Sequence, residues 1–137
     1  MSTYQCDKVI EGVDFHSAHS LYQIDKDRVI VGWDNSFSIV IVGGDKSFSI
    51  VNIDKCVIEN RIDDESFEGV YCFLKLRDNK TILCGCEYGI FCFYDMNTKQ
   101  YKITNDNHHR AISDLLFKDD NTFLSCSWDN TIKVWRY

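Results

Sequence analysis

The stretch that decides the fold is HHRAISDLLFKDDNTFLSCSWDNTIKVW, residues 108–135. It contains three short runs rich in branched and aromatic residues: ISDLLF, FLSCS and IKVW. The segments FKDDNT (117–122) and WDNT (128–131) separate these runs. Asp, Asn and Ser form tight turns through their side chains, so a chain without proline can still reverse direction here. The pattern predicts short antiparallel strands joined by hairpins.

The same framework occurs earlier in the chain. Shifted by 41 residues, CFLKLRDNKTILCGCEYGIFCFY (72–94) aligns with SDLLFKDDNTFLSCSWDNTIKVW (113–135) without a gap, and Leu74 then meets Leu115. Hydrophobic positions and turn positions agree throughout this alignment. A repeat of about 40–45 residues that holds four short strands is typical of propeller blades.

Residues 108–135 resemble a WD repeat, with a His-led entry, two strands separated by a turn, and the motif WDNTIKVW. The framework also covers residues 21–40 and, more loosely, the middle unit. The resemblance implies an all-β fold of β-propeller blades, about three in the chain, each a four-stranded antiparallel sheet. Both faces of such a sheet stack on neighbouring blades, so runs such as SIVIV (38–42) need not alternate.

The resemblance also implies a buried polar network in the last unit, made of His108, Ser125, Asp129 and Trp135. In WD repeats these positions join the loop that enters a blade to its second and third strands. Buried polar groups need hydrogen-bond partners, and a fully satisfied set holds the loop against the sheet. We therefore expect these four residues to have a structural role.

The middle unit departs from this set. Phe67 or Glu68 stands near the position of the histidine, Tyr88 at that of the aspartate and Tyr94 at that of the tryptophan. We expect the first and middle units to rely on apolar packing alone.

The first unit contains a tandem duplication. VIVGWDNSFSI (29–39) is followed by VIVGGDKSFSI (40–50), with nine of eleven positions identical. Aligned on its first copy, Val40 stands where the tryptophan would be, and either Asp34 or Asp45 can mark the turn before the third strand. An extra strand or a long hairpin is expected here.

The two ends of the sequence look complementary. Residues 4–12 (YQCDKVIEG) resemble the fourth strand of a repeat, and Tyr137 follows a set of three strands. WD propellers commonly close by adding an N-terminal strand to the last blade. We expect a single domain with a closing strand at 1–12 and blades at 13–62, 63–106 and 107–137.

Charge and hydropathy exclude several classes of protein. The net charge of −6, without a cluster of Lys and Arg, argues against binding to nucleic acid or an anionic membrane. No apolar run reaches the roughly 18 residues of a membrane span, and the N-terminus lacks the pattern of a signal peptide.

The seven cysteines are an odd number, and most lie in strand-like runs. We expect buried free thiols and a reducing, cytoplasmic location. Cys84 and Cys86 lie two apart on one strand and are the one pair to consider for a metal. Because no second pair completes four ligands, no metal and no other cofactor is expected.

The resemblance favours a protein–protein interaction scaffold that acts as a binding platform within a larger assembly. Loops at the blade ends carry such binding, since they sit on a rigid frame. The candidate contact residues are Trp33, Tyr88, His109, Arg110 and Trp128. The two tryptophans have an alternative role, which is to pack on adjacent blades.

The sequence leaves two alternative functions open. The chain can be a fragment of a split or larger propeller with no separate activity. A propeller enzyme is disfavoured because the sequence holds no nucleophile elbow, phosphate-binding loop or HExxH motif.

The expected partners are other proteins. Closed propellers have about four to eight blades, so three blades leave a gap. A homodimer that forms a six-bladed ring by exchange of the first strand fills it, as does a different chain that supplies blades.

Overall fold

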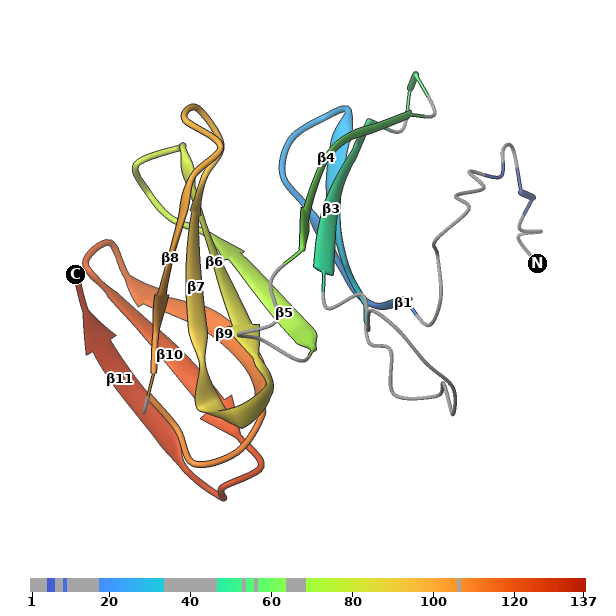
Figure 1. Ribbon diagram of the computed structural model, residues 1–137. Helices are drawn as coiled ribbons and strands as arrows, with labels where there is room; N and C mark the ends of the chain where they lie inside the picture. Colours follow the sequence, from blue (N-terminus) through green and yellow to red (C-terminus); the bar gives the residue numbers. More distant parts are fainter. Residues whose placement is uncertain are drawn as a thin grey trace, which may run out of the picture.

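The computed structural model describes residues 5, 6, 9, 18–33, 47–52, 54–55, 57–63, 69–105 and 107–137. This part of the chain is all-β, with strands β1–β11 and a three-residue 3-10 turn, η1. The strands form three antiparallel sheets that stand side by side, with the first sheet at the right of Figure 1 and the third at the left. The predicted fold class, a partial propeller of about three blades, is confirmed.

Blade 1 has the strand order β1-β2-β3-β4. Its strands are β1 (Ala18–Gln23), β2 (Arg28–Trp33), β3 (Ser47–Asn52) and β4 (Val57–Asp63). The β1–β2 hairpin turns on Asp25, whose Oδ1 accepts hydrogen bonds from the amides of Asp27 (3.1 Å) and Arg28 (2.9 Å). β4 extends one residue past the predicted blade boundary at 62.

The duplication in blade 1 supplies one strand from each copy. β2 begins one residue before the first copy and otherwise lies within it, whereas β3 begins in the second copy, and the two strands pair directly. In blade 3, Trp135 is the second-last residue of its strand and pairs with Phe123, the second residue of β10. In blade 1 the same place is held by Val51, which pairs with Val29, the second residue of β2. The assignment of Val40 to the tryptophan position is therefore wrong. Both Asp34 and Asp45 lie outside the described residues.

Blade 2 has the order β5-β6-β7-β8. It comprises β5 (Val70–Lys75), β6 (Thr81–Cys86), η1 (Glu87–Gly89), β7 (Phe91–Asp95) and β8 (Tyr101–Thr104). Aspartates again form the turns: Asp78 accepts from the amides of Lys80 and Thr81, and Asp95 from those of Asn97 and Thr98.

Blade 3 shows three strands in the described residues: β9 (Ile112–Asp119), β10 (Thr122–Ser127) and β11 (Ile132–Arg136). The pairing of its first strand, β9, with β10 is shifted by one residue from the pairing that the gapless alignment with blade 2 predicts. Leu74 pairs with Leu83 in blade 2, but Leu116 rather than Leu115 pairs with Leu124 in blade 3. A register shift between Thr122 and Phe123 absorbs the difference.

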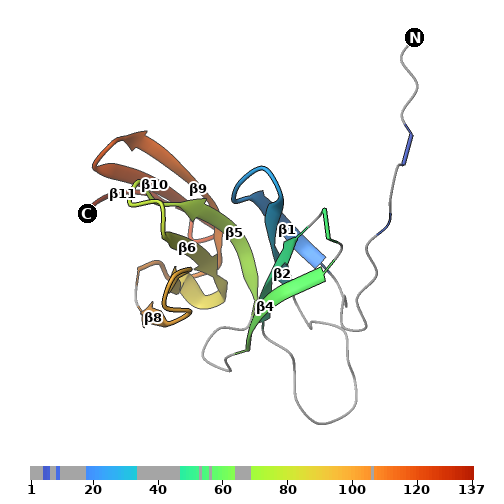
Figure 2. The same ribbon diagram turned by 90° about the horizontal axis from the view of Figure 1, so that it is seen from above.

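The core lies between the sheets. β1 lies beside β5, and β5 beside β9, so the first strand of each blade faces a common side (Figure 2). One buried cluster joins blades 1 and 2 and includes Ile30, Ile50, Ile82 and Tyr94, while a second joins blades 2 and 3. Each blade is thus held by the faces that it shares with its neighbours.

The predicted closing strand at 1–12 falls almost wholly outside the described residues. Of this segment only Gln5, Cys6 and Val9 are described, and none of the three lies in a strand. The closing role of this segment stays a prediction.

Candidate interaction surface

A buried chain of hydrogen bonds crosses blade 3. The indole Nε1 of Trp135 donates to Ser125 Oγ (2.7 Å), and Ser125 Oγ lies 2.6 Å from His108 Nε2. On the other side of the imidazole ring, Nδ1 lies 2.9 Å from Asp129 Oδ2. The structure therefore brings together all four residues of the implied network.

Charge fixes the direction of these bonds. The Asp129 carboxylate can only accept, so His108 Nδ1 donates to it. In the neutral imidazole Nε2 then accepts from the Ser125 hydroxyl, which itself accepts from Trp135. Burial tends to raise the pKa of Asp129, but hydrogen bonds from Thr131, the His109 amide and His108 outweigh it and lower the pKa.

The network also ties down the loop that leads into β9. Asp129 Oδ2 accepts from the amide of His109 (3.1 Å), and Ser127 Oγ donates to the carbonyl of Arg110 (3.0 Å). The Trp128 amide donates to the carbonyl of Ala111 (3.1 Å). His109, Arg110 and Trp128 are therefore neighbours at one end of blade 3, and their backbones are fixed from beneath.

The adjacent turn of blade 2 packs against the same loop. The amide of His108 donates to the carbonyl of Gly89 (3.2 Å), and a Cβ on Gly89 would lie 1.8 Å from the His108 carbonyl oxygen. With φ at 74°, Gly89 is required both by its conformation and by this close approach. This contact places Tyr88 next to the loop of blade 3.

Two residues that the sequence did not single out complete the surface. The ring of Tyr71 lies 5.6 Å from that of Trp128, and its hydroxyl donates to Glu87. We call the resulting patch the blade-end surface; it comprises Tyr71, Glu87, Tyr88, His109, Arg110 and Trp128. No motif marks Tyr71 or Glu87, because their roles depend on the stacking of two blades.

Trp33, the remaining candidate, is the last residue of β2. Its backbone pairs with Ala18. Its side chain lies outside the described part of the structure, so its role as a contact residue stays a prediction.

Blade 2 replaces the network by other contacts. Cys84 stands at the position of Ser125 and is fully buried, and Tyr88 is 60% exposed. Tyr94, which is 1% exposed, accepts a hydrogen bond from Asn60 of blade 1. The expectation of apolar packing alone is therefore wrong for this blade, since a polar contact joins it to blade 1. Phe67 and Glu68 lie outside the described residues.

Cys84 and Cys86, the pair that the sequence offered for a metal, are fully buried. In the described residues no group of three or more His, Cys, Asp or Glu side chains is arranged to hold an ion. Burial is the main reason that the pKa values of the Cys84 and Cys86 thiols are raised, which disfavours the thiolate that metals bind. None of the helices in this part of the chain has the length and apolar character to cross a membrane.

Comparison with known proteins places the last blade in a family. Residues 99–136 match the family model described as WD domain, G-beta repeat. No curated protein sequence matches the chain.

Solved structures share the fold of the whole chain. The WD40 repeats of RRP9 are similar, with a TM-score of 0.74 and 18% identity over 94% of this chain and 38% of that one. U3-55K gives the same values. A computationally designed protein, Ika4, gives a TM-score of 0.60 and 20% identity over 85% of this chain and 63% of its own.

The chain spans less than two thirds of the length of each of these proteins. At such identities the likeness concerns the fold. Residues 99–136 therefore form a WD repeat, and the three described blades share the fold of WD-repeat propellers, as a partial propeller.

Proposed function

We propose that this protein is a protein-binding scaffold of the WD-repeat type, which acts as a platform within a larger assembly. The observation that carries the proposal is the blade-end surface. It exposes large aromatic side chains at the ends of two adjacent blades, above a buried network that fixes their backbones.

The composition of this surface supports binding to a protein. Trp128 is 52% exposed and Tyr88 60%, and Arg110 is exposed beside them. Aromatic and arginine side chains supply most of the energy in protein interfaces, because they combine a large apolar area with a polar end. Glu87 and Arg110 add one charge of each sign, which suits a partner with mixed charge.

The rigidity of the surface supports the same role. Tyr88 has a φ of 55°, a backbone conformation that costs energy for a bulky residue, and it projects into solvent. Strained backbone of this kind gathers at functional positions. Since the adjacent Gly89 is held against the His108 loop, Tyr88 is presented with little freedom left to lose on binding.

The proposal assigns binding and no catalysis to this surface. His108, which lies beneath it, is 2% exposed, and both its ring nitrogens have hydrogen-bond partners. A general base must reach a proton of the substrate. His108 is buried and already hydrogen-bonded through both ring nitrogens, so it is not placed to act as one.

The test is affinity purification followed by mass spectrometry. We expect that a protein captured by the native chain is no longer captured by the Trp128→Ala variant or by the Arg110→Ala variant. Tyr101→Ala is the matched control, because Tyr101 is an exposed aromatic residue on β8 (39% exposed) outside the blade-end surface. A partner retained by Trp128→Ala and Arg110→Ala contradicts the proposal.

We further propose that other chains complete the ring, either a second copy of this chain or a different protein. The reducing, cytoplasmic location remains part of this proposal. Cys72, Cys84, Cys86 and Cys92 support it, since all four are buried free thiols.

A further inference from the structure

The outer face of blade 3 repeats an interface that is filled elsewhere in the molecule. Across blade 2 a row of paired residues, Leu74, Leu83 and Phe93, packs against blade 3. Leu74 is 5% exposed and Leu83 is fully buried. The equivalent row across blade 1 contains Ile30 and Ile50, which pack against blade 2 and are 0% and 4% exposed.

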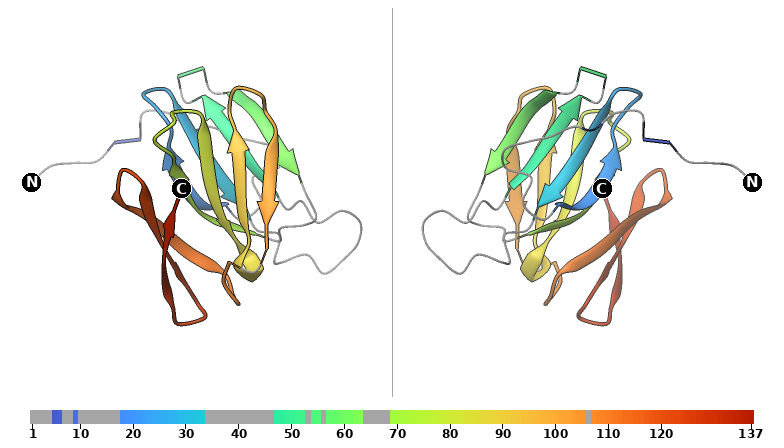
Figure 3. Two further views of the ribbon diagram at one scale, coloured as in Figure 1. Left: turned by 90° about the vertical axis from the view of Figure 1, so that its left-hand side faces the viewer. Right: turned by 90° about the vertical axis from the view of Figure 1, so that its right-hand side faces the viewer.

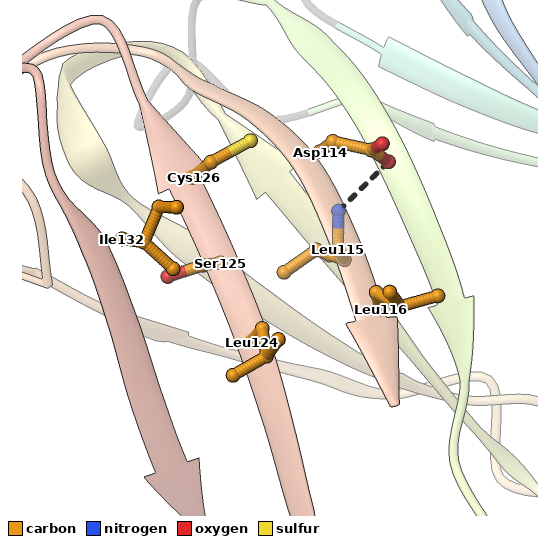
Figure 4. A pocket seen from close by; sticks show the side chains of 7 residues that line it. All are labelled: Asp114, Leu115, Leu116, Leu124, Ser125, Cys126 and Ile132. Carbon is orange, nitrogen blue, oxygen red and sulfur yellow. Dashed lines mark hydrogen bonds between the residues drawn. The ribbon is translucent and has the colours of Figure 1, made fainter. Parts of the chain in front are cut away.

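In blade 3 the same register places Leu116, Leu124 and Val134 in this row. Leu116 is 63% exposed and Val134 61%. Ile132, which pairs with Cys126, is 72% exposed. Leu116, Leu124 and Ile132 line one pocket (Figure 4), and together with Val134 we call them the rear face.

The rear face suits another sheet rather than a small molecule. Its pocket has a volume of about 180 Å³, below the 300–1,000 Å³ that small-molecule sites have. Its lining spans the three strands of blade 3, and in blades 1 and 2 a neighbouring blade covers the equivalent row.

The other half of such an interface lies on blade 1. Phe73 of blade 2 faces blade 1, and Leu115 of blade 3 faces blade 2; they are 4% and 6% exposed. Leu21 holds the equivalent position in blade 1 and is 71% exposed. Val29 and Val31 lie near it and are half-buried. We call these three residues the front face.

We propose that the rear face of one chain docks on the front face of a second copy. The rear face of the second copy docks on the front face of the first in the same way, so that two chains form a closed ring. This inference rests on the part of the proposed function that other chains complete the ring, and it names the occupant. The two faces lie at opposite ends of the row of blades, as the left and right views of Figure 3 show.

The number of copies follows from closure. A front-to-rear contact leads either to a ring or to an open chain of molecules. Closed propellers contain about four to eight blades, and six is the only multiple of three in that range. Two copies therefore complete the ring and leave neither face exposed.

Sedimentation equilibrium tests the inference on the full chain. We expect a mass of twice the 16.0 kDa of one chain. Leu21→Asp and Ile132→Asp, on opposite faces, should each give monomers whose circular dichroism is unchanged, since both side chains are exposed. A native monomer overturns the inference, as does a larger open-ended assembly. A dimer that Ile132→Asp dissociates but Leu21→Asp does not also overturns it, because like faces would then be paired.

Two controls separate this inference from the binding proposal. Trp128→Ala should remain dimeric while it loses its protein partner, and Tyr101→Asp should remain dimeric. A dimeric chain that captures no partner leaves the inference standing and overturns the binding proposal alone.

A measurement without substitutions covers the case in which the variants fail to fold. Cys126 lines the pocket on the rear face. The rate at which Cys126 reacts with a thiol reagent should fall several-fold as the protein concentration rises. A Cys126 rate independent of concentration overturns the inference.

Discussion

Blades 2 and 3 have the same arrangement of strands but are held by different side chains. In blade 3 a polar chain runs from Trp135 through Ser125 and His108 to Asp129. In blade 2 a fully buried cysteine stands at the serine position, and Tyr94 bonds to Asn60 of the neighbouring blade. A blade therefore needs its interior filled and its buried polar groups satisfied, and the motif is one way to do both.

The largest expected effect is that of Trp135→Ala. The ring packs among Phe91 and Phe123 and donates to Ser125, so the loss should lower the free energy of unfolding by about 3–5 kcal/mol. Chemical denaturation measures this change. Arg136→Ala, an exposed change on the same strand, is the control and should cost less than about 0.5 kcal/mol. An unchanged midpoint for Trp135→Ala would show that β11 is misassigned.

The next effect is that of His108→Ala. It removes the histidine partner of the buried Ser125 hydroxyl and one of the donors to Asp129, at a cost of about 1–3 kcal/mol. Tyr94→Phe is the counterpart in blade 2 and removes one hydrogen bond, with an expected cost of about 0.5–1.5 kcal/mol. Equal losses in the two variants would contradict the contrast between the blades.

Acid should affect blade 3 through Asp129. Its pKa is lower in the folded protein than its usual value of 3.8, so the ionised carboxylate favours the folded state. This contribution is fully present above about pH 5 and is lost as the pH falls further. Thermal melts should show a steeper decline below pH 5 for the native chain than for Asp129→Asn. Parallel pH profiles in the two proteins would refute the role of Asp129.

The smallest effect on stability is expected for Tyr88→Ala. The side chain is 60% exposed, and the turn is set by Gly89, so the change should stay within about 0.5 kcal/mol. The same variant should weaken capture of a protein partner, because Tyr88 lies on the blade-end surface. A destabilised variant with intact capture would assign Tyr88 to the fold instead.

The blade 3 network could be predicted because its members lie within 28 residues that carry a family motif. The register of β9 could not. Leu115 and Leu116 are both apolar, and only the register shift at Thr122 decides which of them faces blade 2. In blade 1 the two copies of the duplication are nearly identical, so the sequence could not show that β2 and β3 come from different copies.

The blade-end surface was predicted in part. His109, Arg110 and Trp128 follow from the motif, since they flank residues of the network. Tyr71 and Glu87 were missed, because their contact with Trp128 arises only when blade 2 stacks on blade 3. The contact between Asn60 and Tyr94 was missed for the same reason, as it joins two blades across 34 residues of sequence.

We propose that the buried network of blade 3 holds a protein-binding surface in place. Ser125 is 1% exposed, so it cannot touch a partner, yet it joins Trp135 to His108. The most direct test is the dissociation constant for a captured partner, measured with the native chain and with Ser125→Ala. A folded Ser125→Ala protein should bind at least about tenfold more weakly, which corresponds to about 1.4 kcal/mol. Unchanged affinity in a folded variant would contradict it.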